Sequence, residues 1–183
     1  MHLLEGLLRR KRANIARKLI GAPASILDIG CGPDAEFLWG LRIWDKAGID
    51  PKVEPRYRED IKLIQMDATE PLPFREKRFE AVTMLAVLEH IPLEKTPGLI
   101  DEIKRVLVPD GVLVMTTPTP MAELTLKVMT QWGLVDKDQI NEHHRLMNPK
   151  EIKELLDDKD FRGIKIQEFE LGMNYKIVSR AGP

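Results

Sequence analysis

The sequence predicts an α/β fold: a doubly wound sheet of about seven strands, most of them parallel, with an antiparallel hairpin at the C-terminus. Three observations support this prediction. Short apolar runs of strand length alternate with segments of helical periodicity through most of the chain. The first apolar run ends at two closely spaced glycines, Gly30 and Gly32, and two β-favouring runs split by Gly172 close the chain. Strands that alternate with helices are typical of a parallel sheet covered on both faces.

The expected elements each have a local reason. Residues 79–85 form a continuous apolar-rich run, which is typical of a strand buried on both faces. Asn148, Pro149 and Glu151 suit the N-cap, first and third positions of a helix. Residues 51–61 are near the minimum length for a crossover helix, so we expect an irregular connection there. The expected strands are residues 25–29, 47–49, 62–65, 79–85, 112–117, 164–170 and 175–179, and the expected helices are residues 1–20, 35–44, 96–107, 121–132 and 148–158.

The composition is that of an ordinary soluble protein. Of the 183 residues, 43% are hydrophobic and 31% are charged, so residues 1–183 are expected to form one domain. No apolar run approaches the roughly 20 residues that a membrane span needs. The single cysteine, Cys31, excludes a disulfide framework and fits a reducing, cytoplasmic compartment. A formal net charge of −1 argues against a wholly basic nucleic-acid binder.

The N-terminal segment, residues 1–22, is strongly basic. Residues 1–20 contain six basic residues and one acidic residue, and we expect a helix that ends at Gly21 and Pro23. Three roles remain open for it: a lid over a cofactor, a solvated face, or an electrostatic footprint for RNA. No basic patch interleaved with aromatic residues is recognised along the sequence, which favours the first two roles. The apolar stripe of this helix is expected to consist of Leu4, Leu7, Leu8, Ile15 and Leu19.

The stretch after the first expected strand carries the strongest chemical signal. Gly30 and Gly32 let the backbone turn tightly and approach a ligand before a helix begins. Asp50 ends the second expected strand, where a carboxylate can accept hydrogen bonds from both ribose hydroxyls of a nucleoside. These residues predict a nucleoside-containing cofactor at the carboxyl ends of the strands. Together with Ala35 they also satisfy the dinucleotide fingerprint, so a nicotinamide or flavin cofactor and a purely structural turn remain alternatives.

Eight short motifs follow one another along the chain, at residues 26–32, 48–50, 66–68, 72–74, 79–85, 88–90, 105–113 and 144–151. Each motif is modest by itself, whereas their order is specific. Together they resemble the class I S-adenosylmethionine-dependent methyltransferases, a family with a Rossmann-like fold, and in particular its small-molecule, type 11-like members. One departure is Asp34, which stands where the family often has a third glycine. Its negative charge would repel a pyrophosphate and therefore favours a sulfonium cofactor over a dinucleotide.

The resemblance implies S-adenosyl-L-methionine as the cofactor. The backbone at Gly30 and Gly32 would lie against the methionine portion, with Asp28 orienting the loop and the amino group. Asp50 would hold the ribose, and the segment after the third strand would meet adenine. A side chain at Gly30 is therefore expected to enter the cofactor space while the fold stays largely intact. The implied cofactor-binding residues are Asp28, Gly30, Cys31, Gly32, Asp50, Pro51, Asp67, Ala68, Leu85 and Ala86.

The resemblance also implies methyl transfer by in-line displacement, in which the protein aligns the acceptor and excludes water. A nearby base helps an acceptor that carries a proton. His90, at the exit of the fourth strand, and His144, in a late loop, are the candidate catalytic residues, although each can equally be structural. No metal site is expected, because no histidine pair at helical spacing joins a carboxylate. Cys31 is expected to serve as a small residue in the loop rather than as a reactive thiol.

A small-molecule acceptor is expected, because no added RNA-binding module is present; methylation of RNA is a less favoured alternative. The segments on the acceptor side are short, so the pocket is expected to be partly open or completed by a partner subunit, as in a homodimer. The same shortness keeps open a non-catalytic cofactor-binding module. A nicotinamide-dependent oxidoreductase is disfavoured, because 183 residues leave no room for a substrate domain. No membrane partner is expected.

Overall fold

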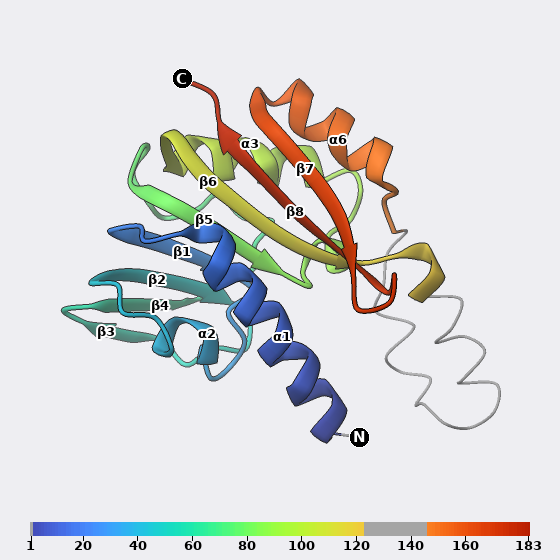
Figure 1. Cartoon of the computed structure of the whole chain (residues 1–183). Helices are drawn as coiled ribbons and strands as arrows, with labels where there is room; N and C mark the ends of the chain where they lie inside the picture. Colours follow the sequence, from blue (N-terminus) through green and yellow to red (C-terminus); the bar gives the residue numbers. More distant parts are fainter. Residues whose placement is uncertain (1, 123–145) are drawn as a thin grey trace.

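The computed structural model describes residues 2–122 and 146–183 and contains one eight-stranded sheet (Figure 1). The strand order is β3-β4-β2-β1-β5-β6-β8-β7. The five neighbours from β4 to β6 are parallel, whereas β3 and β8 run antiparallel to the strands beside them. The strands are β1 (Ser25–Ile29), β2 (Asp45–Asp50), β3 (Arg56–Arg58), β4 (Ile61–Gln65), β5 (Phe79–Leu85), β6 (Leu107–Pro118), β7 (Phe161–Phe169) and β8 (Asn174–Ala181).

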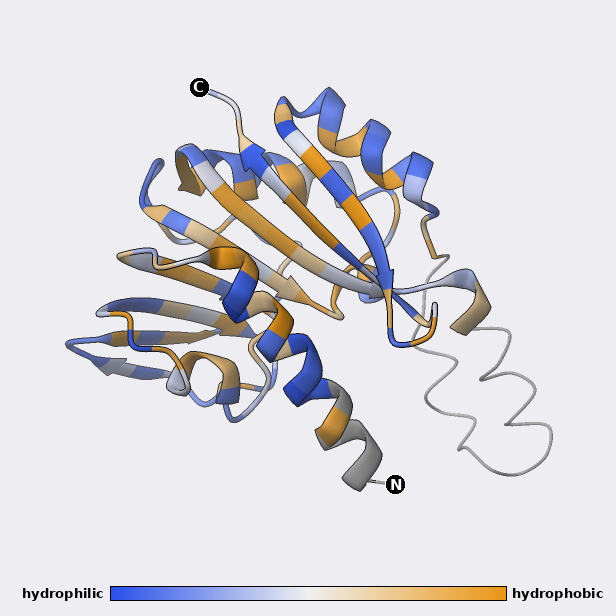
Figure 2. Cartoon of the chain, viewed as in Figure 1, coloured by the Kyte–Doolittle hydropathy of each residue, from blue (hydrophilic) through white to orange (hydrophobic). Residues whose placement is uncertain are grey.

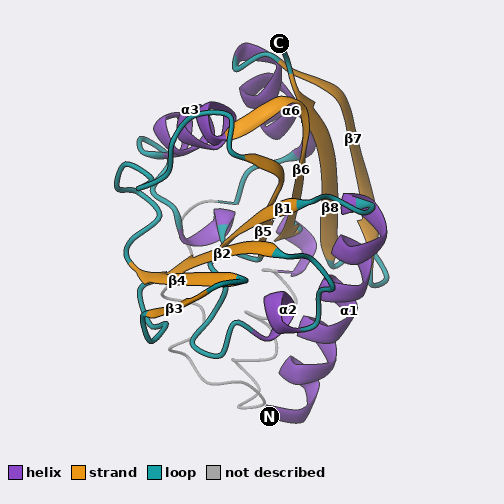
Figure 3. Ribbon diagram, turned by 90° about the vertical axis from the view of Figure 1, so that its left-hand side faces the viewer, coloured by secondary structure: helices purple, strands orange, loops and turns teal. Residues whose placement is uncertain are grey.

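Helices cover both faces of the sheet (Figure 3). On one face lie α1 (His2–Ile20) and the short α2 (Glu36–Trp39), and on the other lie α3 (Thr96–Val106) and α6 (Pro149–Asp158). The sheet therefore separates two apolar clusters, one under each pair of helices. All five residues of β1 are buried, including the polar Ser25 and Asp28, as expected for a strand in the middle of a covered sheet. In Figure 2 hydrophobic residues, in orange, predominate in the central strands, whereas the helices alternate between hydrophobic and hydrophilic residues along their length. These features confirm the predicted fold class.

The structure differs from the sequence-based expectation at three elements. The helix expected over residues 35–44 has only four residues: Ala35 precedes it in the left-handed conformation, with φ 47°, and Gly40 caps its end. The irregular connection expected over residues 51–61 contains β3, an eighth strand that pairs with β4. The strand expected to begin at residue 112 begins at Leu107, since the turn at Asp110, with φ 61°, does not end the element.

The N-terminal helix α1 forms as expected, but only part of the predicted stripe packs on the sheet. Leu19 packs against the apolar cluster beside the buried Ala16 and Ile20, whereas Leu7 is 52% exposed. The reason is that α1 crosses the sheet obliquely, so that its N-terminal half extends past the strands (Figure 1). The helix ends at Gly21, with φ 70°, as predicted.

Two helices expected in the second half of the chain remain, and the described residues include only one of them in full. Beyond Ala122, the helix expected over residues 121–132 lies outside the described residues. The helix expected from Asn148 is confirmed as α6: the Asn148 side chain accepts hydrogen bonds from the amides of Lys150 and Glu151, and Glu151 completes the capping box. Among the described residues, no helix combines the length and the apolar character needed to cross a membrane.

Candidate functional site

The residues singled out by the sequence meet at the edge of the sheet where the parallel strands end. In the register of the sheet, Ile29 of β1 lies beside Ile49 of β2 and Met84 of β5, and Asp50 lies beside Gln65 of β4. The segments that follow these four strands therefore lie side by side along one edge of the sheet. Along this edge they come in the order of residues 66–68, Asp50, the glycine turn at residues 30–32, and residues 85–87.

The glycine turn is held to the end of β2 by backbone hydrogen bonds. The amides of Gly30 and Cys31 donate to the carbonyl of Ile49 at 2.8 and 3.1 Å. The amide of Gly32 donates to Oδ2 of Asp50 at 2.9 Å. Gly30 and Gly32 both adopt left-handed conformations, with φ of 73° and 72°, which glycine favours. The turn is thus built around the Asp50 carboxylate.

The two glycines are required for different reasons. A Cβ atom on Gly30 would come within 2.2 Å of Cγ2 of Val87, so Gly30 is needed for packing against the segment after β5. A Cβ atom on Gly32 would meet no atom within 4 Å. The expectation that a side chain at Gly30 would enter ligand space and spare the fold is therefore wrong. The open surface of the turn is at Gly32.

Asp50 is positioned through both of its carboxylate oxygens. Oδ2 accepts from the amide of Gly32, and Oδ1 accepts from the amide of Lys52 at 2.7 Å. Each carboxylate oxygen has two lone pairs, so both can accept a second hydrogen bond, for example from a diol. The following Pro51 is exposed, and its carbonyl accepts from Nε2 of Gln65 at 3.0 Å.

Asp28 lies beneath the glycine turn and is only 2% exposed. Its Oδ1 accepts a hydrogen bond of 2.6 Å from the hydroxyl of Thr83 on β5. Burial raises the pKa of Asp28 to about 7, and the negative charge of Asp50 contributes to the rise. A cationic ligand group near this turn would favour ionisation of Asp28.

Cys31 is a packing residue rather than a reactive one. Its side chain is buried, and burial together with the charges of Asp28 and Asp50 raises the pKa of its thiol. Its sulfur would lie 2.9 Å from a Cβ atom on Gly48, so it fills the space between the turn and β2. This supports the small-residue interpretation made from the sequence.

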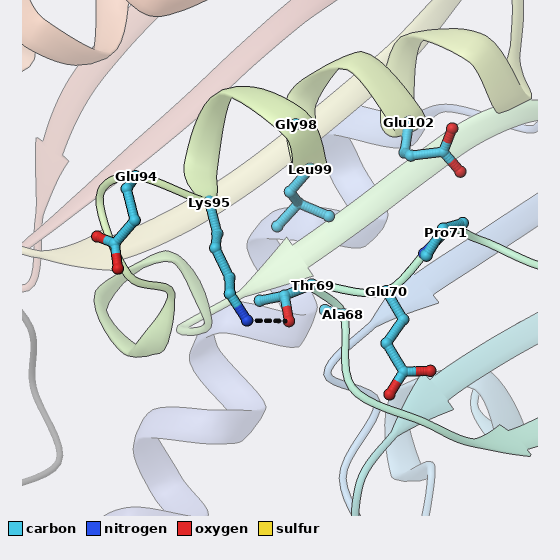
Figure 4. Close-up of a pocket in the computed structure, with 9 residues that line it drawn as sticks. All are labelled: Ala68, Thr69, Glu70, Pro71, Glu94, Lys95, Gly98, Leu99 and Glu102. Atoms are coloured by element: carbon cyan, nitrogen blue, oxygen red, sulfur yellow. Dashed lines mark hydrogen bonds between the residues drawn. The ribbon is translucent and has the colours of Figure 1, made fainter.

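The segment after β4 turns sharply at Asp67. Oδ1 of Asp67 accepts from the amide of Thr69 at 2.7 Å, and this hydrogen bond lowers the pKa of Asp67. A groove of about 360 Å³ runs between this segment and the start of α3, lined by Ala68, Thr69, Lys95 and other residues. Lys95 extends across the groove, and its Nζ donates to Oγ1 of Thr69 at 3.3 Å (Figure 4).

The segment after β5 forms the other end of the edge. Leu85 and Ala86 are half-buried, and Ala86 is left-handed, with φ 58°. The amide of Ala86 donates to the carbonyl of Thr116 at 2.9 Å, which ties this segment to β6. The 3₁₀ turn η1 (Leu88–His90) follows directly.

Glu89 is a buried carboxyl that the sequence reasoning did not assign. It is 5% exposed, and its Oε2 accepts from the hydroxyl of Thr117 at 3.2 Å. Burial raises the pKa of Glu89; its own backbone amide and the nearby charges of His90 and Arg12 partly oppose this rise. The sequence feature that could have identified Glu89 is its position next to His90, directly after an apolar strand. Arg12 belongs to α1, so the basic helix approaches the site here.

The two candidate catalytic histidines differ in what the structure shows. His90 is exposed at the end of η1, and its amide donates to the carbonyl of Val87 at 2.9 Å. His144 lies outside the described residues. Within residues 2–122 and 146–183, no group of three or more histidine, cysteine, aspartate or glutamate side chains could hold a metal ion.

Gly30→Ala and Gly32→Ala should differ in their cost to the fold. Both need the left-handed conformation, which costs an alanine about 1–2 kcal/mol. Gly30→Ala adds the clash with Val87 and should lose about 1–3 kcal/mol more in urea unfolding. Adding Val87→Ala to Gly30→Ala should recover part of that excess. Equal losses for the two glycine variants would contradict the packing role of Gly30.

Asp28→Asn should flatten the dependence of stability on pH. Because the pKa of Asp28 is raised on folding, its stabilising contribution is full below about pH 4 and is lost as the pH rises to about 7. Between these pH values the folded state holds one proton that the unfolded state has released. The free energy of unfolding therefore falls by about 1.4 kcal/mol for each unit by which the pH rises. Urea unfolding from pH 5 to pH 8 measures this slope.

The matched control is Asp34→Asn, which removes an exposed charge in the same loop. That variant should keep the slope of the original protein. If Asp28→Asn and the original protein lost stability in parallel as the pH rose, the raised pKa of Asp28 would be refuted.

Comparison with known proteins agrees with this geometry. A family model described as a methyltransferase domain matches residues 2–166. No curated protein matches the sequence. Among solved structures, an S-adenosylmethionine-dependent methyltransferase from Archaeoglobus fulgidus is 20% identical, with a TM-score of 0.73, covering 96% of this chain and 93% of that one.

Two other solved structures share the fold. The 1,6-didemethyltoxoflavin-N1-methyltransferase of Burkholderia thailandensis, solved with bound 1,6-didemethyltoxoflavin and S-adenosylhomocysteine, is 21% identical, with a TM-score of 0.68 and coverage of 96% of this chain and 79% of that one. A methyltransferase complexed with the Haloferax volcanii Trm112 activator is 15% identical, with a TM-score of 0.71 and coverage of 96% and 89%. The match over residues 2–166, on this fold, shows that the chain belongs to the class I S-adenosylmethionine-dependent methyltransferases.

Proposed function

We propose that this methyltransferase transfers a methyl group from S-adenosylmethionine to a small-molecule acceptor by in-line displacement. The single observation that supports the site assignment is the order of groups along the sheet edge. Asp67, Asp50, the glycine turn and Leu85 follow one another on the neighbouring strands β4, β2, β1 and β5. This order matches adenine, ribose, the methionine portion and the methyl group of one extended cofactor.

The residues present fit such a cofactor. Asp50 is held by two backbone amides and keeps lone pairs for a ribose diol. Gly32 presents open space, so the backbone there can lie against the methionine portion. Asp50 supplies negative charge where a sulfonium and an ammonium group would lie, and such a cation would favour ionisation of the buried Asp28. The bound cofactor supplies a methyl group that is already activated for transfer.

We assign the roles along the edge as follows. Gly30 and Cys31 shape the turn, Gly32 borders the methionine portion, and Asp28 lies beneath it as a buried acid. Asp50 holds the ribose and Pro51 flanks it. The remaining contacts are Asp67 and Ala68 with adenine, and Leu85 and Ala86 beside the cofactor on the β5 side.

The acceptor is proposed to enter beyond β5, beside η1. His90 is exposed there and is proposed to act as a base for an acceptor that carries a proton, with His144 as a second candidate. A small-molecule acceptor is supported by the Burkholderia enzyme of the same fold, which is named for 1,6-didemethyltoxoflavin and was solved with that compound bound. Completion of the pocket by a second subunit, in a homodimer or with an activator as in the Haloferax complex, is part of the proposal.

Three further proposals concern the domain organisation, the role of α1 and the cellular location. One domain, residues 1–183, is supported by the single sheet that includes strands from both ends of the described chain. α1 is proposed as the wall of the acceptor side, because Arg12 approaches Glu89. A cytoplasmic location is supported by the lone cysteine, Cys31.

A thermal-shift titration tests the cofactor and its use. S-adenosylmethionine and S-adenosylhomocysteine should raise the melting temperature with concentration, whereas NADH and NADPH should not, because only a ligand of the folded state stabilises it. Turnover of S-adenosylmethionine against a panel of small amines, phenols and thiols should then find an acceptor. Stabilisation without turnover for any acceptor would favour a non-catalytic cofactor-binding module.

Asp50→Ala should weaken S-adenosylhomocysteine binding by about 1–3 kcal/mol, the scale of hydrogen bonds to a charged group. Titration calorimetry measures the affinity, and urea unfolding checks that the variant is folded. Asp34→Ala is the matched control, since it removes an exposed carboxylate from the same loop and should bind as the original protein does. Unchanged affinity of a folded Asp50→Ala variant would overturn the ribose assignment.

A further inference from the structure

Three elements on one side of the molecule concentrate positive charge. α1, α2 and β3 together contain eight basic and two acidic residues, although the whole chain has 28 basic and 29 acidic residues. We call this side the basic flank and define it by five exposed residues. They are Lys11, Lys18, Trp39, Arg56 and Arg58.

Contacts between side chains show that the basic flank is continuous. α1 contacts α2 through Arg10, which lies 3.9 Å from Glu36, and through Arg17, which lies 5.6 Å from the centre of the Phe37 ring. α2 in turn contacts β3 through Trp39. In Figures 1 and 3, α2 lies beside α1, on the side of the sheet that ends in β3.

Trp39 places an aromatic ring among these charges. Its side chain is 40% exposed, so part of the indole ring is accessible from solvent. The guanidinium groups of Arg56 and Arg58 lie 5.8 and 6.0 Å from the centre of its ring. Arg56 and Arg58 share one face of β3, because side chains alternate along a strand. The linear sequence gave no sign of this aromatic and basic cluster, since Trp39 and the two arginines come from separate elements.

The side chains of the basic flank are suited to a ligand with a row of phosphate groups and planar aromatic rings. Lys11 and Lys18 are seven residues apart, two helical turns, so they lie on one side of α1 and can follow a row of charges. Indole rings and guanidinium planes are groups on which nucleobases stack. Glu36 is paired with Arg10, while Glu54 and Glu59 next to β3 are exposed, so α1 supplies most of the excess charge.

A membrane surface fits less well. A helix that binds a bilayer must bury its apolar side in lipid. In the C-terminal half of α1, which carries Lys18, that side is already used, because Ala16 and Ile20 are buried against the sheet; Leu7 is an exposed apolar residue of the N-terminal half. The exposed indole and arginines lie on α2 and β3, which are fixed by the fold.

We propose that the basic flank binds single-stranded nucleic acid, with phosphates along α1 and bases against the Trp39, Arg56 and Arg58 cluster. The flank reaches the site edge where Arg12 approaches Glu89. Binding on the flank does not depend on methyl transfer, and the nucleic acid need not carry the acceptor.

The test measures binding of a fluorescein-labelled oligo(U) RNA of about 20 nucleotides to the full chain by fluorescence anisotropy, from about 50 to about 200 mM salt. The original protein should bind and should weaken at least about tenfold across that range. Arg56→Ser/Arg58→Ser and Lys11→Ser/Lys18→Ser should each bind more weakly. The Lys11→Ser/Lys18→Ser pair should also lower the slope of log affinity against log salt by about 1.4, that is about 0.7 per phosphate contact on a single strand.

Two matched controls separate the flank from general effects. Tyr57→Ala removes an exposed aromatic ring from the same strand, but on the opposite face, where Lys62 lies 5.6 Å from the ring centre. Lys150→Ser/Lys153→Ser removes two charges from α6, which lies beside β7 at the other edge of the sheet. Both controls should bind oligo(U) as the original protein does, and urea unfolding checks the fold of every variant.

Several results would overturn the proposal. Absence of oligo(U) binding at the lowest salt would do so, as would equal loss of binding in the flank variants and the α6 control. Binding to vesicles of anionic lipid without binding to oligo(U) would identify the flank as a membrane surface instead. An unchanged salt slope in the Lys11→Ser/Lys18→Ser variant would place the phosphate contacts elsewhere on the chain.

Discussion

The attachment of the glycine turn to the end of β2 is the constraint on which the rest of the site depends. Two amides of the turn bind the Ile49 carbonyl, and a third binds the Asp50 carboxylate. To make these bonds the chain must pass through left-handed conformations at Gly30 and Gly32. Close contact of Gly30 with Val87 then brings the end of β5 against the turn. Three strand ends are thereby held together by one short segment.

Buried carboxyl groups give the same edge its electrostatic character. Asp28 lies under the turn and Glu89 lies under the segment after β5, and burial raises the pKa of both groups. Neither has an ion pair at hydrogen-bond distance among the described residues; each accepts from a threonine hydroxyl. Such groups are costly to ionise in isolation, and a bound cation lowers that cost. An edge of this kind is matched to a ligand that carries positive charge, as a sulfonium cofactor does.

Basic side chains are concentrated on the face of the sheet that α1 and α2 cover, next to this edge. α1 packs on the sheet through small and apolar residues near its C-terminus, so its basic residues remain outside. α2 is too short to cover β3, and Trp39 therefore stays partly exposed beside Arg56 and Arg58.

The sequence by itself determined the fold class and the principal landmarks of the site. Alternating apolar runs predicted the parallel strands, and Gly30, Gly32 and Asp50 were identified because turns and strand ends need particular residue types at short spacing. Local patterns of this kind are readable because their cause lies within a few neighbouring residues. The capping box at Asn148 is another case.

Only the tertiary structure decided which residues face one another. The contact between Gly30 and Val87, the burial of Glu89 beneath Thr117, and the cluster of Trp39 with Arg56 and Arg58 join segments that are distant in sequence. The same holds for the buried side of α1, which depends on the angle at which the helix crosses the sheet rather than on its own periodicity. Long-range packing sets these relations, and no single segment contains the information for them.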